Sequence, residues 1–285
     1  MNVVARNVAV ARLWWSASAA ALLLVLAVLA AIFGFVFIKG IPALRDPAIF
    51  VTVTSGVAGG LANAIVGTIM LVAGGVLLVT VIGIGTALWV TEFAPAGARR
   101  LLRFVIDVLA GVPSIVVGYF LYVALVVGAG WGFSLAAGAI ALAIIMLPYV
   151  VRAADLALSG VPRGLREAAF ALGARPVTVA FSIALPWALP GILTGILVAT
   201  GIGLGETAPL IYTAGWSNFM PRLAFTHAPV AYLTYVVWSF INMPFERSHA
   251  LAYAAAALLM IAIFVLNLVS RTAVDYWVRR TRGRR

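Results

Sequence analysis

The sequence predicts an all-α membrane protein with six transmembrane helices. Of its 285 residues, 65% are hydrophobic and only 9% are charged, and the mean hydropathy is +1.15. This composition is typical of chains that cross a lipid bilayer several times. Long apolar runs alternate with short polar segments, and roughly 20 apolar helical residues are enough to cross the hydrocarbon core. We therefore expect membrane lipid to surround most of the chain.

The first two spans are expected at residues 14–38 and 63–90. The first run is too long for the apolar region of a cleavable signal peptide, so we expect it to be retained. Residues 39–62 carry prolines, glycines and charges, which predict an aqueous loop. Glycines recur along the second span, and small residues allow helices to approach closely, so we expect this span to pack inside the bundle.

The third span, at residues 104–127, follows a charged turn and contains Pro113, which we expect to kink the helix because proline removes a backbone hydrogen bond. Asp107 lies four residues after Arg103, a spacing that predicts a local ion pair on one helix face. We favour this pair over a proton-relay role for the carboxylate.

The remaining spans are expected at residues 133–151, 185–212 and 251–269. A polar, arginine-bearing loop separates the first two of these. Within it, Pro162 suits the start of a short helix and Gly173 suits the left-handed residue that ends one. We expect a short amphipathic helix here, exposed on one side of the membrane.

The distribution of basic residues predicts that both termini are cytoplasmic. With that topology, fifteen of the nineteen basic residues lie on the inside, and the four outside are Lys39, Arg45, Arg222 and Arg247. This bias follows the positive-inside rule, so the net charge of +11 is an orientation signal and does not indicate nucleic acid. Residues 229–242 are apolar, but fourteen helical residues extend only about 21 Å, which favours an interfacial or re-entrant external segment over a span.

The loop before the fifth span carries a signature of seven residues in register: Glu167, Ala168, Ala169, Gly173, Ile183, Leu185 and Pro186. The pattern resembles the cytoplasmic loop of type I ABC importer permeases, which have the MetI-like fold. The resemblance implies that Glu167, Ala168, Ala169 and Gly173 couple the permease to a separate ATPase subunit. Small alanines permit close approach and glycine permits a sharp turn. An ordinary solvated loop between helices is the alternative.

Three further motifs resemble the permeases of phosphate ABC importers: residues 63–68 (NAIVGT), 111–116 (GVPSIV) and 205–210 (GETAPL). The resemblance divides the chain into an N-terminal helix and external loop (1–58), a type I permease domain (59–270) and a basic cytoplasmic tail (271–285). It implies import of inorganic phosphate across the inner membrane of a prokaryote.

Glu206 is the expected centre of the translocation path. A carboxylate within a span is unfavourable unless it faces a cavity or a partner, so a pathway role is the default hypothesis. The matching motifs add Thr207, Pro209 and Ser114 to the path. The alternative for Glu206 is a purely structural role, in which its carboxylate holds two helices together.

One departure from the family pattern bears on the substrate. These permeases commonly carry an arginine three residues before the motif's first glycine, where this chain has Ile202. Arginine pairs well with oxyanions, so the anion contact would come from Arg222, from the partner permease or from backbone groups. Sulfate, molybdate and tungstate remain alternative substrates. A secondary transporter is disfavoured because no internal repeat is visible, and an intramembrane hydrolase because its motifs are missing.

The resemblance also implies the partners of the chain. They are a second permease subunit (PstC-like), ATPase subunits (PstB-like) and an external phosphate-binding protein (PstS-like). We expect no catalytic residue, metal or cofactor. Gly201, Gly203 and Gly205 lack the Lys-Ser/Thr that completes a phosphate-binding loop, so ATP hydrolysis is expected in the partner subunits.

Overall fold

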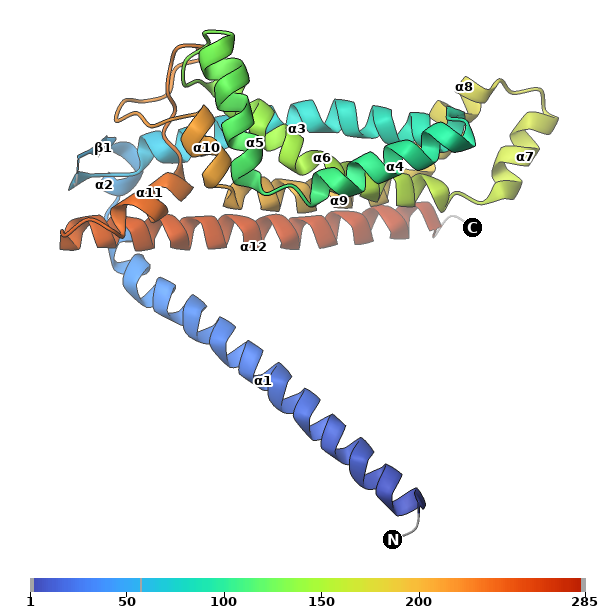
Figure 1. Cartoon of the computed structure of the whole chain (residues 1–285), viewed down its shortest axis with the longest axis horizontal. Helices are drawn as coiled ribbons and strands as arrows, with labels where there is room; N and C mark the ends of the chain where they lie inside the picture. Colours follow the sequence, from blue (N-terminus) through green and yellow to red (C-terminus); the bar gives the residue numbers. More distant parts are fainter. Residues whose placement is uncertain (1–2, 57, 283–285) are drawn as a thin grey trace.

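The computed structural model describes residues 3–56 and 58–282 and consists almost entirely of helices (Figure 1). The long helices are α1 (Val3–Leu44), α3 (Ala62–Leu88), α6 (Leu135–Ser159), α9 (Leu185–Gly205) and α12 (Glu246–Arg282). The shorter ones are α2 (Ala48–Val51), α4 (Ala96–Ala110), α5 (Ser114–Leu121), α7 (Arg163–Ala171), α8 (Pro176–Val179), α10 (Ala208–Thr213) and α11 (Leu233–Phe240). The π-helical turns are η1 (Trp89–Phe93), η2 (Tyr122–Gly128) and η3 (Ala180–Ala184), and strands β1 (Thr54–Ser55) and β2 (Ala58–Gly59) form an antiparallel hairpin.

Five segments are long and apolar enough to cross a membrane: Ala11–Leu44, Ala62–Phe93, Leu135–Ser159, Pro176–Gly205 and Glu246–Ser270. A sixth span results if α4 is counted together with α5 and η2, although the two parts meet at an angle of 96°. The described part of the chain therefore confirms the predicted all-α membrane fold, with the third of the six spans broken.

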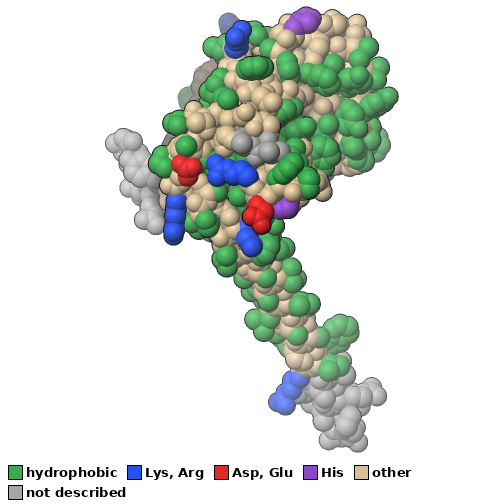
Figure 2. Space-filling model, turned by 90° about the vertical axis from the view of Figure 1, so that its left-hand side faces the viewer, with side chains coloured by type: hydrophobic (Ala, Val, Ile, Leu, Met, Phe, Trp, Pro, Cys, Tyr) green, Lys and Arg blue, Asp and Glu red, His purple; other side chains and the backbone are tan. Residues whose placement is uncertain are grey.

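The bundle has two distinct ends (Figure 1). Helices α7 and α8 lie at one end, near the C-terminus, and the hairpin, α2 and α11 lie at the other. Helix α1 packs against α12 near the hairpin end and then leaves the bundle at an angle. Figure 2 looks onto the hairpin end, where charged side chains are few and scattered, and shows the projecting α1 covered largely by hydrophobic ones. This helix is exposed along its apolar length, as expected for a surface that contacts lipid.

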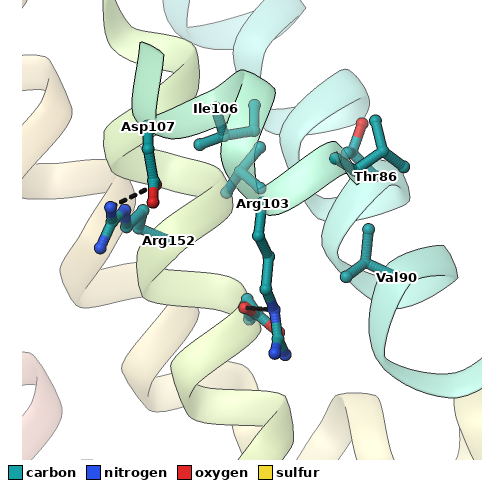
Figure 3. A pocket seen from close by; sticks show the side chains of 9 residues that line it. Thr86, Val90, Arg103, Ile106, Asp107 and Arg152 are labelled. Carbon is teal, nitrogen blue, oxygen red and sulfur yellow. Dashed lines mark hydrogen bonds and ion pairs between the residues drawn. The ribbon is translucent and has the colours of Figure 1, made fainter. Parts of the chain in front are cut away.

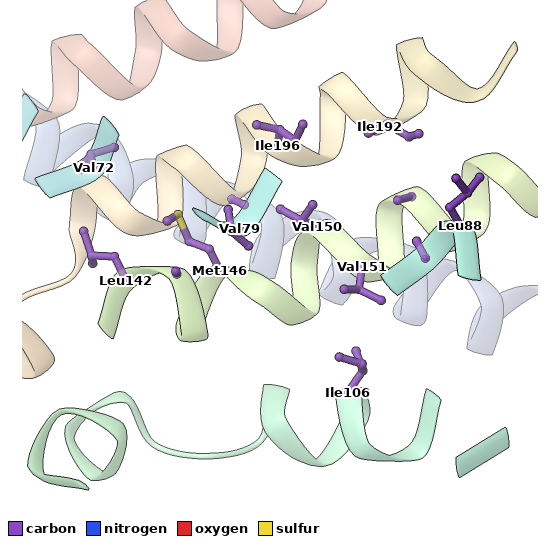
Figure 4. Close-up of a cluster of buried hydrophobic side chains, with 14 of the residues drawn as sticks. Val72, Val79, Leu88, Ile106, Leu142, Met146, Val150, Val151, Ile192 and Ile196 are labelled. Carbon is purple, nitrogen blue, oxygen red and sulfur yellow. The ribbon is translucent and has the colours of Figure 1, made fainter. Parts of the chain in front are cut away.

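Helix α6 forms the centre of the core, between α3 and α9 (Figure 4). A Cβ on Gly75 would lie 2.9 Å from Cβ of Leu142, and one on Gly83 would lie 2.8 Å from a side-chain carbon of Val150. These two glycines therefore allow α3 to approach α6 closely, as predicted. The span is nevertheless only 33% buried, so its other face is exposed and the span does not lie inside the bundle. Gly85, by contrast, faces open space.

The third span differs from the prediction of a kinked helix over residues 104–127. Helix α4 ends at Ala110, and α5 begins only after Pro113. Proline lacks an N–H donor and disfavours helical geometry at the residue before it, here Val112, which explains the break. Helix α4 itself is amphipathic and carries Arg103 and Asp107, so it extends the charged segment well beyond the predicted boundary.

The fifth span also differs from its predicted bounds of 185–212. It begins at Pro176 and ends at Gly205, where the backbone of Glu206 becomes extended (φ −72°, ψ 133°). A continuous helix would leave the Gly205 carbonyl without its partner, because Pro209 has no N–H. The break therefore separates α9 from α10 and places Glu206 between two helix ends.

The apolar segment at residues 229–242 contains only the eight-residue helix α11, which extends about 12 Å and is too short to cross a bilayer. It packs against α12 and α3. At the other end of α12, the helix continues to Arg282, into the predicted basic tail. Residues 283–285 of that tail lie outside the described part of the chain.

Candidate functional site

The signature loop folds into the short helix α7 and a glycine turn. Pro162 precedes the helix with an extended backbone (ψ 131°), and Gly173 follows it at φ +79°, the left-handed conformation predicted for this position. The Gly173 N–H donates to the Phe170 carbonyl at 2.9 Å. Glu167 and Ala168 are exposed, whereas Ala169 is buried. The predicted amphipathic helix is therefore present, with two of the four proposed coupling residues displayed on its surface.

Arg166 attaches α7 to the bundle. Its Nη2 contacts Glu92 Oε1 at 2.7 Å and its Nε donates to Glu92 Oε2 at 3.3 Å. It also donates to the carbonyls of Leu158 and Val161, each at 2.8 Å. Sequence reasoning missed this contact, because Arg166 and Glu92 are 74 positions apart and no local spacing could indicate it.

Two ion pairs join α4 to α6 in opposite directions (Figure 3). Arg103 pairs with Asp155, and Asp107 pairs with Arg152. The predicted local pair between Arg103 and Asp107 is therefore wrong: both side chains turn toward α6 because oppositely charged partners lie there. These four residues line a cavity of about 100 Å³ between α3, α4 and α6.

Glu206 and Ser114 face a common cavity of about 210 Å³ near the break between α4 and α5. Tyr149 of α6 also lines it, and most of the other lining residues are apolar. The Thr234 hydroxyl donates to the backbone carbonyl of Glu206 at 2.7 Å and so holds the break in place. Among the residues that line this cavity, the only charged side chain is the Glu206 carboxylate.

The other two predicted path residues lie beside this cavity and do not line it. Thr207 precedes α10, and Pro209 is buried against α5, where a Cβ on Gly118 would lie 2.5 Å from Pro209 Cα. Thr207 and Pro209 thus shape the chain after Glu206. Arg222, the candidate anion ligand, is exposed in the segment between α10 and α11 and does not line the cavity.

Glu206 also borders a second, much smaller cavity of about 10 Å³. Thr68, Tyr232 and Thr234 line it, and the buried Tyr232 hydroxyl has no hydrogen-bond partner among the described residues. Of the residues that the structure describes, Glu206 alone lines both cavities. Sequence reasoning did not find Tyr232, because its segment carries no motif.

Comparison with known proteins agrees with this architecture. Residues 79–283 match the family described as binding-protein-dependent transport system inner membrane component. The phosphate transport system permease protein PstA 2 of Mycobacterium bovis is 41% identical over 281 residues, which cover 99% of this chain and 92% of that protein. PstA of Haemophilus influenzae is 37% identical over 235 residues, 82% of each chain.

A solved structure supports the fold. The MetNI methionine ABC transporter in an inward-facing conformation superposes with a TM-score of 0.59 and 20% identity, covering 76% of this chain and 95% of the other. The permease fold and the nearly full-length relatives lead to one assignment. The chain belongs to the binding-protein-dependent transport system inner membrane components and, among them, to the PstA permeases.

Proposed function

We propose that the chain is the permease subunit of an ATP-driven importer of inorganic phosphate. The observation that carries this proposal is the 41% identity to a phosphate transport system permease over 99% of the chain. Similarity over 99% of the chain includes every segment that can line a path, so it supports a shared substrate better than one motif does. Sulfate, molybdate and tungstate are the competing substrates.

The proposed coupling residues are Glu167, Ala168, Ala169 and Gly173. The position of α7 supports this role, because it lies at the end of the bundle opposite the hairpin. The exposed Glu167 and Ala168 offer a surface that a separate ATPase subunit can contact. The Gly173 turn then leads the chain back into the fifth span.

The proposed translocation path passes the cavity that Glu206 and Ser114 share. A carboxylate repels phosphate, so Glu206 acts as a gate or pairs with a cation from a partner, and the Ser114 hydroxyl supplies a neutral hydrogen-bond donor. Thr207 and Pro209 act indirectly, by fixing where α10 begins. The positive charge that phosphate needs comes from outside this cavity, and the second permease is its proposed source.

The complete importer contains a second permease (PstC-like), ATPase subunits (PstB-like) and an external phosphate-binding protein (PstS-like). The proposed topology places both termini, α7 and the basic start of α4 on the cytoplasmic side, and the hairpin and α11 outside. The basic residues of the tail and of α4 support this orientation through the positive-inside rule.

Uptake of labelled phosphate tests the function directly. Cells with and without this gene are compared at micromolar phosphate, with sulfate, molybdate or tungstate in excess as competitors. We expect deletion to remove uptake, the competitors to have no effect, and expression of the gene to restore it. Unchanged phosphate uptake on deletion, although the intact importer is expressed in the parent cells, would reject phosphate as the substrate.

A further inference from the structure

We propose that the ion pair between Arg166 and Glu92 is the link through which the coupling helix α7 moves α3 and α6. Arg166 is then a positioning residue that acts inside the permease, while its neighbour Glu167 faces outward. This inference rests on the proposed coupling role of α7. It adds Arg166 and Glu92 to that role and specifies that motion passes from α7 to α3 and α6.

The contacts of Arg166 reach two different spans. Its guanidinium binds Glu92, in the turn η1 that directly continues α3. The same guanidinium donates to the Leu158 carbonyl in the last turn of α6 and to the Val161 carbonyl just beyond it. The planar fork of arginine can make these contacts together, which a lysine ammonium cannot do with the same geometry. The chain itself connects α7 to α6 through the short segment 160–162, and Arg166 adds the contact that connects α7 to the end of α3.

The pair is better shielded from solvent than the other ion pairs. The side chains of Arg166 and Glu92 are 18% and 11% exposed, compared with 48% and 18% for Arg103 and Asp155. A shielded, hydrogen-bonded pair resists separation more strongly than an exposed one, because either charge alone would be left poorly solvated. The pair is therefore able to stay intact when α7 moves relative to α3.

The turn η1 is also hydrogen-bonded to α4. Arg99, in the first turn of α4, donates to the carbonyls of Val90 at 3.0 Å and Ala94 at 3.2 Å. Glu92 thus lies in a segment that is tied to α4 as well as to α7. Helices α4 and α6 both line the cavity of Glu206, through Ala110 and Tyr149 among others. A displacement of α7 can therefore reach that cavity through consecutive contacts.

The experiment follows cavity access directly. The chain has no native cysteine, so Ala110→Cys introduces one thiol into its cavity lining. The labelling rate of this thiol by a maleimide is measured in the complete reconstituted complex, with and without ATP. It is measured in the parent sequence and with Glu92→Gln or Arg166→Gln added. Glu246→Gln, an exposed carboxylate at the opposite end of the bundle, is the matched control.

We expect ATP to change the labelling rate in the parent and in the control. With Glu92→Gln or Arg166→Gln, we expect the ATPase subunits to copurify as before, while phosphate uptake per ATP hydrolysed falls at least about tenfold. In both Gln variants, we also expect the ATP-dependent change in the labelling rate of the thiol to disappear. Arg166→Lys keeps the positive charge but lacks the planar guanidinium, so we expect a smaller fall in uptake per ATP hydrolysed than with Arg166→Gln.

Two results would overturn the proposal. The first is an unchanged ATP response in both Gln variants, which would show that force takes another route. The second is failure of the ATPase subunits to copurify with these variants, which would make the pair a part of the docking surface. If the parent imports no phosphate but its labelling still responds to ATP, the substrate assignment fails while the link is still tested.

Discussion

Arg103 of α4 donates two hydrogen bonds to Asp155 of α6, at 2.9 and 2.8 Å. Asp155 also accepts from the Thr91 hydroxyl at 3.3 Å, so one carboxylate connects α6 to α4 and to the turn that follows α3. One helical turn away, Asp107 and Arg152 form the reverse pair (Figure 3). Matched charges therefore join three helices at this end of the bundle.

Asp155→Asn should weaken this junction. The amide keeps the shape of the side chain but removes the charge, and we expect a loss of about 1 kcal/mol, since Arg103 is half exposed and solvent screens the pair. Thermal unfolding of the purified permease in detergent should show a lower midpoint, and the difference from the parent should shrink at high salt.

A double-mutant cycle with Arg103→Gln isolates the pair. Arg100→Gln, on the same helix and exposed, serves as the control. If the losses from Asp155→Asn and Arg103→Gln simply add, the two side chains do not stabilise each other.

Gly118→Ala should disrupt the packing of α5 on α10. The added Cβ would lie 2.5 Å from the Cα of Pro209, and backbone at this position cannot move aside as a flexible side chain can. We expect a loss of about 1–3 kcal/mol, again measured as thermal unfolding in detergent. Gly85→Ala is the control: it lies in α3 with open space around it, so its higher helix propensity should make it neutral or stabilising. Equal effects of the two substitutions would contradict this account.

The features predicted well from sequence depend on local chemistry. Long apolar runs identified the spans. Pro162 and Gly173 predicted the ends of α7 to within a residue or two, because the conformational preferences of proline and glycine are local. The extended backbone at Glu206 was missed, although Pro209 was visible, because proline inside a span is compatible with either a kink or a break.

The features missed depend on tertiary partners. Spacing indicated a pair between Arg103 and Asp107. In the structure, each residue instead pairs with an oppositely charged residue of α6. The contact between Arg166 and Glu92 joins segments that lie far apart in the sequence, and a single sequence carries no local spacing that could indicate it. Family motifs suggested Ser114 and Glu206 separately as residues of the path. The sequence did not indicate that the two side chains line one cavity.

Gly173→Asp should abolish phosphate uptake and leave the permease folded. A Cβ at Gly173 would meet no atom within 4 Å, so the variant has only the strain of a positive φ, about 1–2 kcal/mol at most. Membrane insertion should therefore be unchanged, and the thermal midpoint should fall by no more than the few degrees that this strain accounts for. The lost uptake would come from the bulk and charge placed beside the proposed ATPase contact.

Gly97→Asp tests whether an added carboxylate is harmful in itself. Gly97 lies in the first turn of α4 with open space around it, and an acidic residue is favourable at a helix N-terminus. We expect normal uptake from this control. Normal uptake from Gly173→Asp as well would remove the coupling role from the turn.

Glu206→Gln separates a pathway role from a structural one. The break after α9 is set by the backbone at Glu206, by Pro209 and by the hydrogen bond from Thr234 to the Glu206 carbonyl, none of which needs the carboxylate. The variant should therefore unfold at the same temperature as the parent, while its uptake falls at least about tenfold, as expected when the only charged side chain that lines this cavity is neutralised. Ser114→Ala, in the lining of the same cavity, should reduce uptake less because a neutral hydroxyl contributes less than a charge. If Glu206→Gln lowers the thermal midpoint and uptake together, the carboxylate holds helices in place, and the path must be sought elsewhere in the importer.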